Sequence, residues 1–263
     1  MDKSDVFGVQ QRRLVVLDNA EIHSKLLGIL KSVDNICKKE NIAYMLTQGT
    51  LLGAIREKGF IPWDIEDVDI MMHRKDYNVF IAYCKKYPDD LLFFPGRDDD
   101  VYGIVPRLKF KQNPEIFAEI FLIDRVPENL IKQYFKYFIL ILLRGMLSLS
   151  SNIPTDNTTV AMKTKYFGMW CLRLLGRLFD RETKQNFYTK ASQYFSDKDC
   201  SWVFFSNEAM QKMTVKLDKN LLNETLRVPF EDTELLVPKE WDSILKLYYG
   251  DSYMVPKREN YKM

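Results

Sequence analysis

The chain has 263 residues, 46% of them hydrophobic and 28% charged, with a formal net charge of +2. This length can bury a large core and form one domain, or one domain with a sizeable insertion. Because basic and acidic residues nearly cancel, composition excludes a general nucleic-acid binder, and we expect no nucleic-acid partner. The N-terminal residues contain no apolar run with a cleavage site, which a secretory signal would have, so we expect a cytoplasmic protein.

Cysteines and histidines are few and scattered. Cys37, Cys84, Cys171 and Cys200 form no C-x-x-C pair. This spacing predicts buried free thiols of a reducing compartment and argues against a zinc site. His23 and His73 are the only histidines, and we expect surface or packing roles for both.

The first long element in the chain is a predicted helix that starts after Asp18 and ends at Asn41. Asp18 and Glu21 have capping-box spacing, with Asp in place of the usual Ser or Thr. Apolar residues recur at helical spacing between them and Asn41, so one face should pack on the core. An apolar strand from Ile42 to Leu46 follows.

A candidate phosphate site comes next. Gln48-Gly49-Thr50 follows the strand and opens a predicted helix from Leu51 to Glu57. Glycine lets the backbone approach a ligand closely, and a helix start offers N–H groups and the positive end of a dipole. These three residues are therefore candidate phosphate ligands.

Two basic residues and a tryptophan lie just beyond. Arg56 and Lys58 form either a solvated helix end or contacts to a donor phosphate, and the guanidinium fork of Arg56 suits a phosphate. Trp63 follows Pro62. It is either a wedge that fixes the loop, the role we favour, or a stacking surface for a base or sugar.

An acidic cluster ends this stretch. In Asp67-Val68-Asp69-Ile70, side chains alternate across a strand, so Asp67 and Asp69 share one face. A lone D-x-D is usually a solvated acidic edge. After a phosphate site, however, two ionised carboxylates favour a hard cation such as Mg²⁺ that also carries substrate phosphates.

The pattern then predicts a helix at 74–87 and strands at 91–94, 104–110 and 116–123. Arg107 and Lys109 share a face of their strand, which is either a solvent-facing edge or a second phosphate contact. Glu119 lies inside an apolar strand, where a charge is costly unless it is paired or bound to metal. Glu119 is therefore the candidate third carboxylate, from a strand beside Asp67 and Asp69.

The region from Glu128 to about Arg181 is expected to be helical, with a loop at 150–159. The runs 130–148 and 166–178 are apolar with scattered Lys and Arg, yet neither is long and uncharged enough for a convincing transmembrane helix. They form either a buried helical hairpin or a basic, amphipathic surface on a membrane that suits a lipid-linked acceptor.

The motif GTLLGAIREKGFIPWD, followed by the acidic cluster and D-V-D-I, resembles the LicD family of phosphocholine transferases, which is more distantly similar to fukutin-related protein. The C-terminal segments VPFED, VPK and LKLYYGD resemble the same family, so the resemblance covers about residues 40–124 and 225–256. In this pattern Asp64 and Glu66 are both candidates for the outer acidic position. Glu231 either faces the site or is an ion-pair or hairpin residue.

The resemblance implies an α+β fold, with a nucleotidyltransferase-like mixed sheet flanked by helices and a helical insertion. We predict a catalytic core at 1–127, a helical insertion at 128–200 facing a membrane or acceptor, and a C-terminal part at 201–263 that completes the core. A peripheral location on the inner face of the cell membrane, through 130–178, is the alternative to a purely cytoplasmic one.

The implied function is transfer of a phospho-alcohol group, such as phosphocholine, from a CDP-linked donor to a hydroxyl of a cell-surface glycan or glycolipid, with release of CMP. Asp67 and Asp69 would hold Mg²⁺ or Mn²⁺ on the pyrophosphate. Glu119 would complete the metal site or take the acceptor proton. Gly49, Thr50 and Arg56 would bind phosphate oxygens.

Three alternatives remain open. A nucleotidyltransferase that moves NMP onto a sugar or small molecule uses the same carboxylates. A D-x-D glycosyltransferase would use a UDP- or GDP-sugar and leave the Gly-Thr helix start unexplained. A non-catalytic glycan- or membrane-binding module would give no reason to keep three costly carboxylates.

Overall fold

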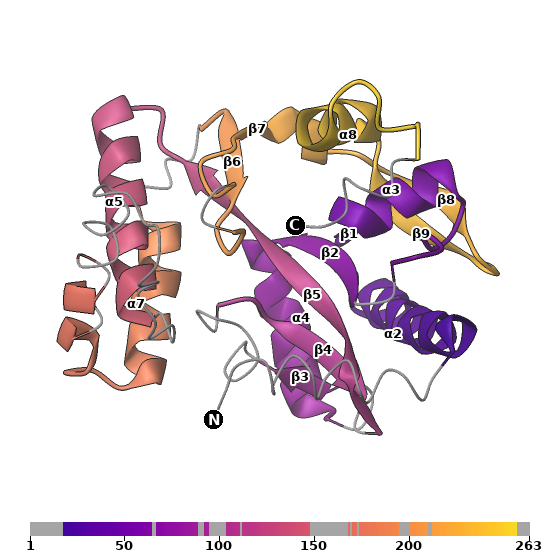
Figure 1. Ribbon diagram of the computed structural model, residues 1–263, viewed down its shortest axis with the longest axis horizontal. Helices are drawn as coiled ribbons and strands as arrows, with labels where there is room; N and C mark the ends of the chain where they lie inside the picture. Colours follow the sequence, from indigo (N-terminus) through magenta and orange to yellow (C-terminus); the bar gives the residue numbers. More distant parts are fainter. Residues whose placement is uncertain are drawn as a thin grey trace, which may run out of the picture. The chain divides into compact units, whose positions relative to one another are not determined.

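The computed structural model describes residues 18–64, 67–88, 92–94, 104–110, 112–147, 168, 170–172, 174–194, 200–209 and 212–256. Two compact units divide these residues. Unit 1 holds those up to Phe94, those from Arg107 to Leu122 and those from Leu217 onward, and unit 2 holds the rest. The helices and strands confirm the predicted α+β class (Figure 1). The predicted loop at 150–159 lies outside the described residues.

The sheet of unit 1 has the strand order β1-β2-β5-β4-β3. Its strands are β1 Met45–Leu46, β2 Asp67–His73, β3 Leu92–Phe94, β4 Arg107–Phe110 and β5 Asn113–Val126, the last of which continues into unit 2. β1 pairs antiparallel with β2, and β4 pairs antiparallel with both β3 and β5. This order places β2 and β5, which carry the candidate carboxylates, next to each other.

The predicted strand from Ile42 is wrong at its start. Asn41 adopts a left-handed conformation with φ of 52°, and the N–H of Ile42 donates to the carbonyl of Cys37 at 2.8 Å. Residues 41 and 42 therefore complete the C-terminal cap of the preceding helix, and only Met45–Leu46 pair as a strand.

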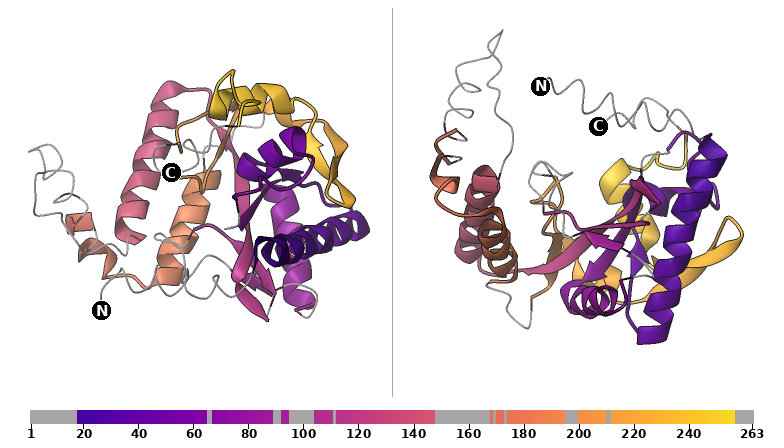
Figure 2. Two further views of the ribbon diagram at one scale, coloured as in Figure 1. Left: turned by 45° about the vertical axis from the view of Figure 1, so that its right-hand side comes forward. Right: turned by 90° about the horizontal axis from the view of Figure 1, so that it is seen from below.

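Helix α2, Asn19–Glu40, has the predicted N-terminal cap. The Asp18 carboxylate accepts the N–H of Glu21 at 2.7 Å, while Glu21 pairs with Lys25. Its apolar face, from Ile22 to Cys37, is buried. α4, Arg74–Lys86, packs beside α2, and both helices contact β2 (Figure 2).

Helix α3, Gln48–Arg56, begins earlier than the predicted Leu51. The carbonyl of Thr47 accepts the N–H of Leu51 at 2.9 Å, which starts the helix one turn sooner. Residues 48–50 thus form the first helical turn instead of a loop that leads into it.

The C-terminal part of unit 1 contains β7 Leu217–Asp218, the 3-10 helix η1 Lys219–Leu222, a hairpin of β8 Thr225–Phe230 and β9 Thr233–Pro238, and α8 Trp241–Tyr249. The buried carboxylate of Asp34 ties this hairpin to α2. It accepts hydrogen bonds from Arg227 and Tyr44, both at 2.9 Å, and pairs with Lys38 at 2.7 Å. Burial opposes ionisation, but these partners outweigh it and lower the pKa of Asp34.

Unit 2 contains α5 Leu130–Leu147, α7 Arg181–Gln193 and β6 Trp202–Phe205, which pairs antiparallel with the end of β5. α5 and α7 lie side by side (Figure 1). Their core includes Val126, Tyr137, Leu140, Tyr188 and Phe204. Among the described residues, no helix is both long and apolar enough to cross a membrane.

Candidate metal and donor site

Three carboxylates from two neighbouring strands meet in unit 1. On β2, Val68 and Ile70 are 1% and 0% exposed, while Asp67 and Asp69 alternate with them and are half-buried. Glu119 comes from β5, the next strand of the sheet. One oxygen from each of the three carboxylates lies within 4.8 Å of the other two. The structure therefore brings together the three residues that the sequence singled out.

This cluster suits a divalent cation. Oxygen ligands of Mg²⁺ lie about 2.0–2.1 Å from the ion, so that opposite ligands of an octahedron are about 4 Å apart. Carboxylate oxygens within 4.8 Å of each other need only small side-chain movements to reach that spacing. Mn²⁺ accepts the same oxygen donors.

An arginine holds the third carboxylate. In the antiparallel register, Arg107 of β4 lies opposite Glu119 of β5. The guanidinium donates from Nε at 3.0 Å and from Nη2 at 2.7 Å, both to Oε1 of Glu119. Both side chains are less than one-fifth exposed. Arg107 thus fixes the orientation of Glu119 and reduces repulsion among the three carboxylates.

Lys109 lies on the same face of β4 and is not at a solvent-facing edge. It is 7% exposed, and its Nζ lies 5.5 Å from the centre of the Phe117 ring. The Arg107 guanidinium lies over the same ring at 4.2 Å. Both cations therefore lie on one face of the sheet, and Arg107 contacts a carboxylate of the cluster.

The start of α3 is fastened to the metal-binding strand. The N–H of Asp69 donates to Oγ1 of Thr50 at 2.8 Å, and the N–H of Thr47 donates to the carbonyl of Asp69 at 3.1 Å. First-turn N–H groups have no acceptor within the helix. The predicted phosphate site and the predicted metal site are therefore adjacent, with the Thr50 hydroxyl used as a structural acceptor.

Thr47 is a residue that the sequence reasoning missed. It precedes α3 at the N-cap position but makes no side-chain cap bond. Its hydroxyl is buried and has no hydrogen-bond partner in the described structure, which is uncommon for a buried polar group. A Thr directly before a helix start was the available sequence signal.

Gly49 makes room for Asp64. A Cβ on Gly49 would lie 3.0 Å from Oδ2 of Asp64, so the glycine allows this carboxylate to approach the positive end of α3. The His23 Nε2 lies 2.8 Å from the Asp64 carbonyl, and the His23 ring stacks on Phe60 at 4.3 Å. His23 therefore has the expected packing role. Glu66, the other candidate for the outer acidic position, lies outside the described residues.

Glu231 sits at the turn of the β8–β9 hairpin with φ of 53°. Its carboxylate accepts the N–H of Phe60 at 3.0 Å, and its own N–H donates to the carbonyl of Lys58 at 2.9 Å. A Cβ on Gly59 would lie 2.1 Å from Glu231 Oε1. Of the two predicted roles for Glu231, these contacts support that of a hairpin residue, which holds the loop after α3.

Arg56 lies at the far end of α3 from Gly49. Its side chain is 4% exposed and donates to Glu57 at 2.6 Å and to the carbonyl of Tyr253 at 3.2 Å. These bonds fasten the C-terminal segment to α3. The exposed Lys58 follows at the loop with φ of 58°. A role for Arg56 or Lys58 as a phosphate contact stays a prediction, and Trp63 is half-buried in the loop beyond.

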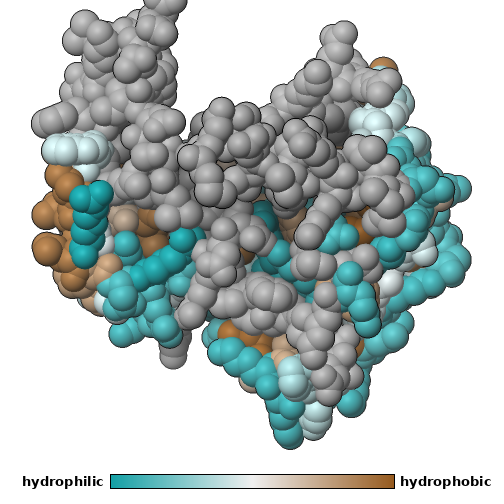
Figure 3. All heavy atoms as spheres, turned by 60° about the horizontal axis from the view of Figure 1, so that its bottom comes forward, coloured by the Kyte–Doolittle hydropathy of each residue, from teal (hydrophilic) through white to brown (hydrophobic). Residues whose placement is uncertain are grey.

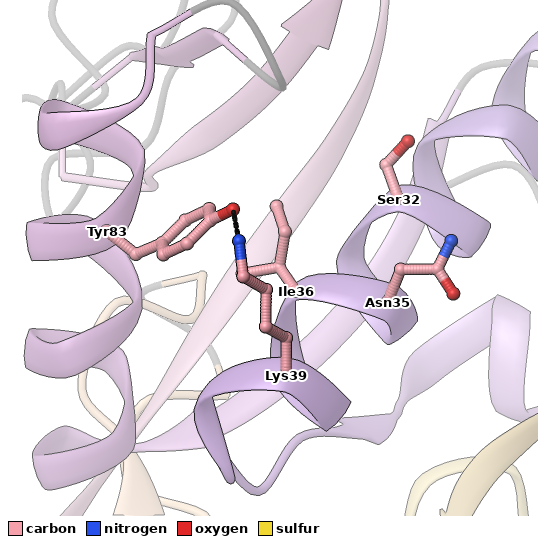
Figure 4. Close-up of a pocket in the computed structure, with 5 residues that line it drawn as sticks. All are labelled: Ser32, Asn35, Ile36, Lys39 and Tyr83. Atoms are coloured by element: carbon pink, nitrogen blue, oxygen red, sulfur yellow. Dashed lines mark hydrogen bonds between the residues drawn. The ribbon is translucent and has the colours of Figure 1, made fainter.

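A separate cavity of about 260 Å³ lies between α2 and α4 (Figure 4). Ser32, Asn35, Ile36, Lys39 and Tyr83 line it. Lys39 donates to the Tyr83 hydroxyl at 3.1 Å and lies over the Tyr83 and Tyr87 rings. None of the residues predicted for the site lines this cavity.

Carboxylates on adjacent strands beside a helix start are the arrangement that metal-dependent enzymes use to handle phosphate groups. Residues 41–136 match the domain family described as "LicD/FKTN/FKRP, nucleotidyltransferase domain". Residues 41–136 are thus similar to the LicD family, and the resemblance found in the motifs is confirmed.

Individual proteins are also similar to this chain. Lipopolysaccharide cholinephosphotransferase LicD of Haemophilus influenzae is 27% identical over 254 residues, which cover 90% of this chain and 91% of that protein. An uncharacterized protein of Rickettsia prowazekii is 31% identical over 113 residues, 40% of this chain and 41% of the relative.

Proposed function

We propose that this protein transfers a phospho-alcohol group, with phosphocholine as the first candidate, from a CDP-linked donor to a hydroxyl of a cell-surface glycan or glycolipid and releases CMP. The observation that carries the proposal is the cluster of Asp67, Asp69 and Glu119 beside the start of α3. The cholinephosphotransferase relative, matched along nearly its whole length, supports the choice of reaction.

In this proposal Asp67, Asp69 and Glu119 hold Mg²⁺ or Mn²⁺. A bound cation would offset charge on the pyrophosphate and on the leaving CMP. The three carboxylates fit this role because their oxygens already lie within 4.8 Å of one another. Without a cation, the same proximity is costly.

The N-terminal turn of α3 binds the donor phosphates. The backbone N–H groups of Gln48, Gly49 and Thr50 point along the helix axis at its positive end. The unpartnered hydroxyl of Thr47 supplies a further donor at the same place. Arg107, which contacts Glu119, and Lys109, on the same face of β4, provide positive charge for the rest of the diphosphate.

Glu119 is better suited to hold a cation than to take the acceptor proton. Its two hydrogen bonds from Arg107 fix the carboxylate in place. Asp67 and Asp69 share the cation with Glu119, and a carboxylate oxygen of these two that does not bind the cation accepts the proton of the acceptor hydroxyl as that hydroxyl attacks phosphorus in line.

The test is a product assay with purified protein. CDP-choline, CDP-ethanolamine, CDP-ribitol, CDP-glycerol, CTP and UDP-glucose are each incubated with a glycan acceptor, with and without Mg²⁺, and the products are separated by mass. We expect metal-dependent release of CMP and gain of a phospho-alcohol by the acceptor. Asp69→Asn should slow this reaction roughly 10²- to 10³-fold. Glu224→Gln, which changes an exposed carboxylate that pairs with Lys239, is the control and should leave the reaction unchanged.

Other products would identify a different enzyme. Release of pyrophosphate from CTP, with NMP on the acceptor, would establish a nucleotidyltransferase. Transfer of glucose from UDP-glucose would establish a glycosyltransferase. Binding of a glycan with no turnover of any donor would contradict the proposal and favour the binding module.

A further inference from the structure

Two buried threonine hydroxyls lie at the start of α3. Hydrophilic side chains cover most of the described surface on the face in Figure 3, where a hydroxyl can bond to water. Thr47 and Thr50 are instead only 1% and 8% exposed. A buried hydroxyl needs a partner from the protein or from a ligand. The partners of these two hydroxyls therefore indicate what the junction between β1 and α3 holds.

The hydroxyl of Thr50 replaces a backbone acceptor. The antiparallel register of β1 and β2, continued by one residue, pairs Thr47 with Asp69. In a regular ladder such a pair exchanges two bonds. The N–H of Thr47 does donate to the Asp69 carbonyl at 3.1 Å, but the Thr47 carbonyl accepts the N–H of Leu51 at 2.9 Å. The N–H of Asp69 donates instead to Oγ1 of Thr50 at 2.8 Å.

A left-handed residue produces this exchange. Gln48 has φ of 47°, in a region that residues other than glycine seldom adopt. It turns the chain from β1 directly into α3, so that the Thr47 carbonyl serves the helix and not the sheet. A left-handed residue beside right-handed ones also turns successive N–H groups toward one point, which makes a concavity that binds anions. The same turn thus creates the proposed phosphate site and the need for the Thr50 hydroxyl.

The hydrogen of the Thr50 hydroxyl is left over from this bond. A hydroxyl has one hydrogen to donate and two lone pairs that accept. Oγ1 accepts from Asp69, and among the residues that the structure describes the hydroxyl donates to none. The hydrogen is therefore available in the first turn of α3, where the proposed donor phosphates bind.

We propose that Thr50 positions Asp69 for cation binding and that the same hydroxyl donates to a phosphate oxygen of the CDP-linked donor. One side chain then fixes the backbone of a cation ligand and contacts the group that the cation would neutralise. Hydrogen bonds in such a series polarise one another. The inference rests on the proposed function and deepens it, because it assigns two bonds of one hydroxyl to the two halves of the site.

A purely structural role for Thr50 has different consequences. Loss of the hydroxyl would leave the N–H of Asp69 without its acceptor and would lower the free energy of unfolding. The affinity of the folded protein for a cation would stay the same. Cation affinity measured without donor therefore separates a positioning role from a structural one.

The experiment is a calorimetric titration of the full chain with Mn²⁺, without donor or acceptor. Thr50→Val removes the hydroxyl at nearly constant volume and should weaken Mn²⁺ binding roughly tenfold. Thr50→Ser keeps the hydroxyl and should restore the affinity to within about twofold of the wild type. Thr47→Val is the matched control. It removes the neighbouring hydroxyl but keeps the N–H bond to the Asp69 carbonyl, so the Mn²⁺ affinity should not change.

A second titration adds CDP to each protein at saturating Mn²⁺. Thr50→Val should weaken CDP binding roughly tenfold, because a hydrogen bond to a charged phosphate oxygen is lost. Thr50→Ser should bind CDP normally. Melting temperatures must show that each variant is folded. Thr50→Cys, whose thiol is a weaker donor and acceptor, should give intermediate affinities and takes the place of a valine variant that does not fold.

Equal Mn²⁺ affinity in the wild type and Thr50→Val would overturn the positioning role, as would absence of Mn²⁺ binding by the wild type. Equal CDP affinity would overturn the phosphate contact. A Mn²⁺ defect in Thr50→Val, in a protein that turns over no CDP-linked donor, would support the positioning role and contradict the proposed reaction. The two failures are therefore distinguishable.

Discussion

Helices α2 and α5 place charge in opposite ways. α2 buries its apolar residues and keeps most of its charges in water, and its one buried carboxylate, Asp34, is paired. α5 buries Lys136 and Arg144 and exposes Ile131 and Phe138. The hydrophobic effect accounts for the first arrangement, whereas in the second hydrogen bonds to other elements hold the buried cations in place.

The two units also use their buried charges for different purposes. In unit 1, the half-buried carboxylates Asp67, Asp69 and Glu119 repel one another and suit chemistry more than stability. In unit 2, the buried cations hold elements together. Altering the charges of the site should therefore change activity at constant stability, and altering those of α5 should change stability. The predictions below test this division, from the largest expected effect to the smallest.

Asp69→Asn should reduce the rate of transfer roughly 10²- to 10³-fold, because it removes a carboxylate from the proposed metal site. Without metal, the melting temperature should stay the same or rise, since repulsion with Asp67 is relieved. The assays are turnover of CDP-choline and thermal unfolding with and without Mg²⁺. Wild-type turnover in this variant would refute a catalytic role for the cluster.

Arg144→Met should lower the free energy of unfolding by about 3 kcal/mol, because bonds to Tyr188 and Ser206 are lost from a fully buried site. Turnover per folded molecule with a soluble acceptor should be unchanged. Denaturant titration measures the loss. Tyr188→Phe, which removes one hydroxyl, is the milder comparison, and an unchanged midpoint in Arg144→Met would contradict the role given to this cation.

Asp34→Asn should lower the free energy of unfolding by about 2 kcal/mol near neutral pH. The pKa of Asp34 is below its ordinary value of 3.8 in the folded protein. Its contribution is therefore complete above that value and is lost as the pH falls through the lower folded pKa. Denaturation curves of wild type and variant should converge in acid. A difference that persists there would point to a cause other than ionisation.

Arg107→Lys should weaken metal binding about 10-fold to 100-fold, because lysine cannot make both bonds to Glu119. Saturating Mg²⁺ should restore most of the activity, which a merely structural defect would not permit. Metal titration by calorimetry measures the shift. The control is Arg125→Lys. It changes an exposed arginine of β5, the strand that carries Glu119, and should leave metal affinity unaltered.

Thr47→Val should leave the free energy of unfolding unchanged or raise it by about 1 kcal/mol, because it removes a buried hydroxyl that has no partner. The same change should raise the KM for the CDP-linked donor if that hydroxyl binds it. Steady-state kinetics and thermal unfolding separate the two effects. A loss of stability with normal kinetics would make Thr47 a structural residue.

Local patterns in the sequence determined much of this protein. The alternation in Asp67–Ile70 placed two carboxylates on one face, the spacing of Asp18 and Glu21 placed the start of α2, and the charge of Glu119 in an apolar strand marked it for pairing or metal. Each follows from the period of a single helix or strand, which a short window of sequence contains.

Tertiary structure alone decided the contacts between distant segments. The pair of Arg107 and Glu119 depends on the register of β4 against β5, and the bond from Asp69 to Thr50 depends on how α3 meets β2. The orientation of α5 was undetermined because its sequence is apolar on nearly every side. Hydrogen bonds of Lys136 and Arg144 to other elements, which no local pattern encodes, turned its apolar residues outward.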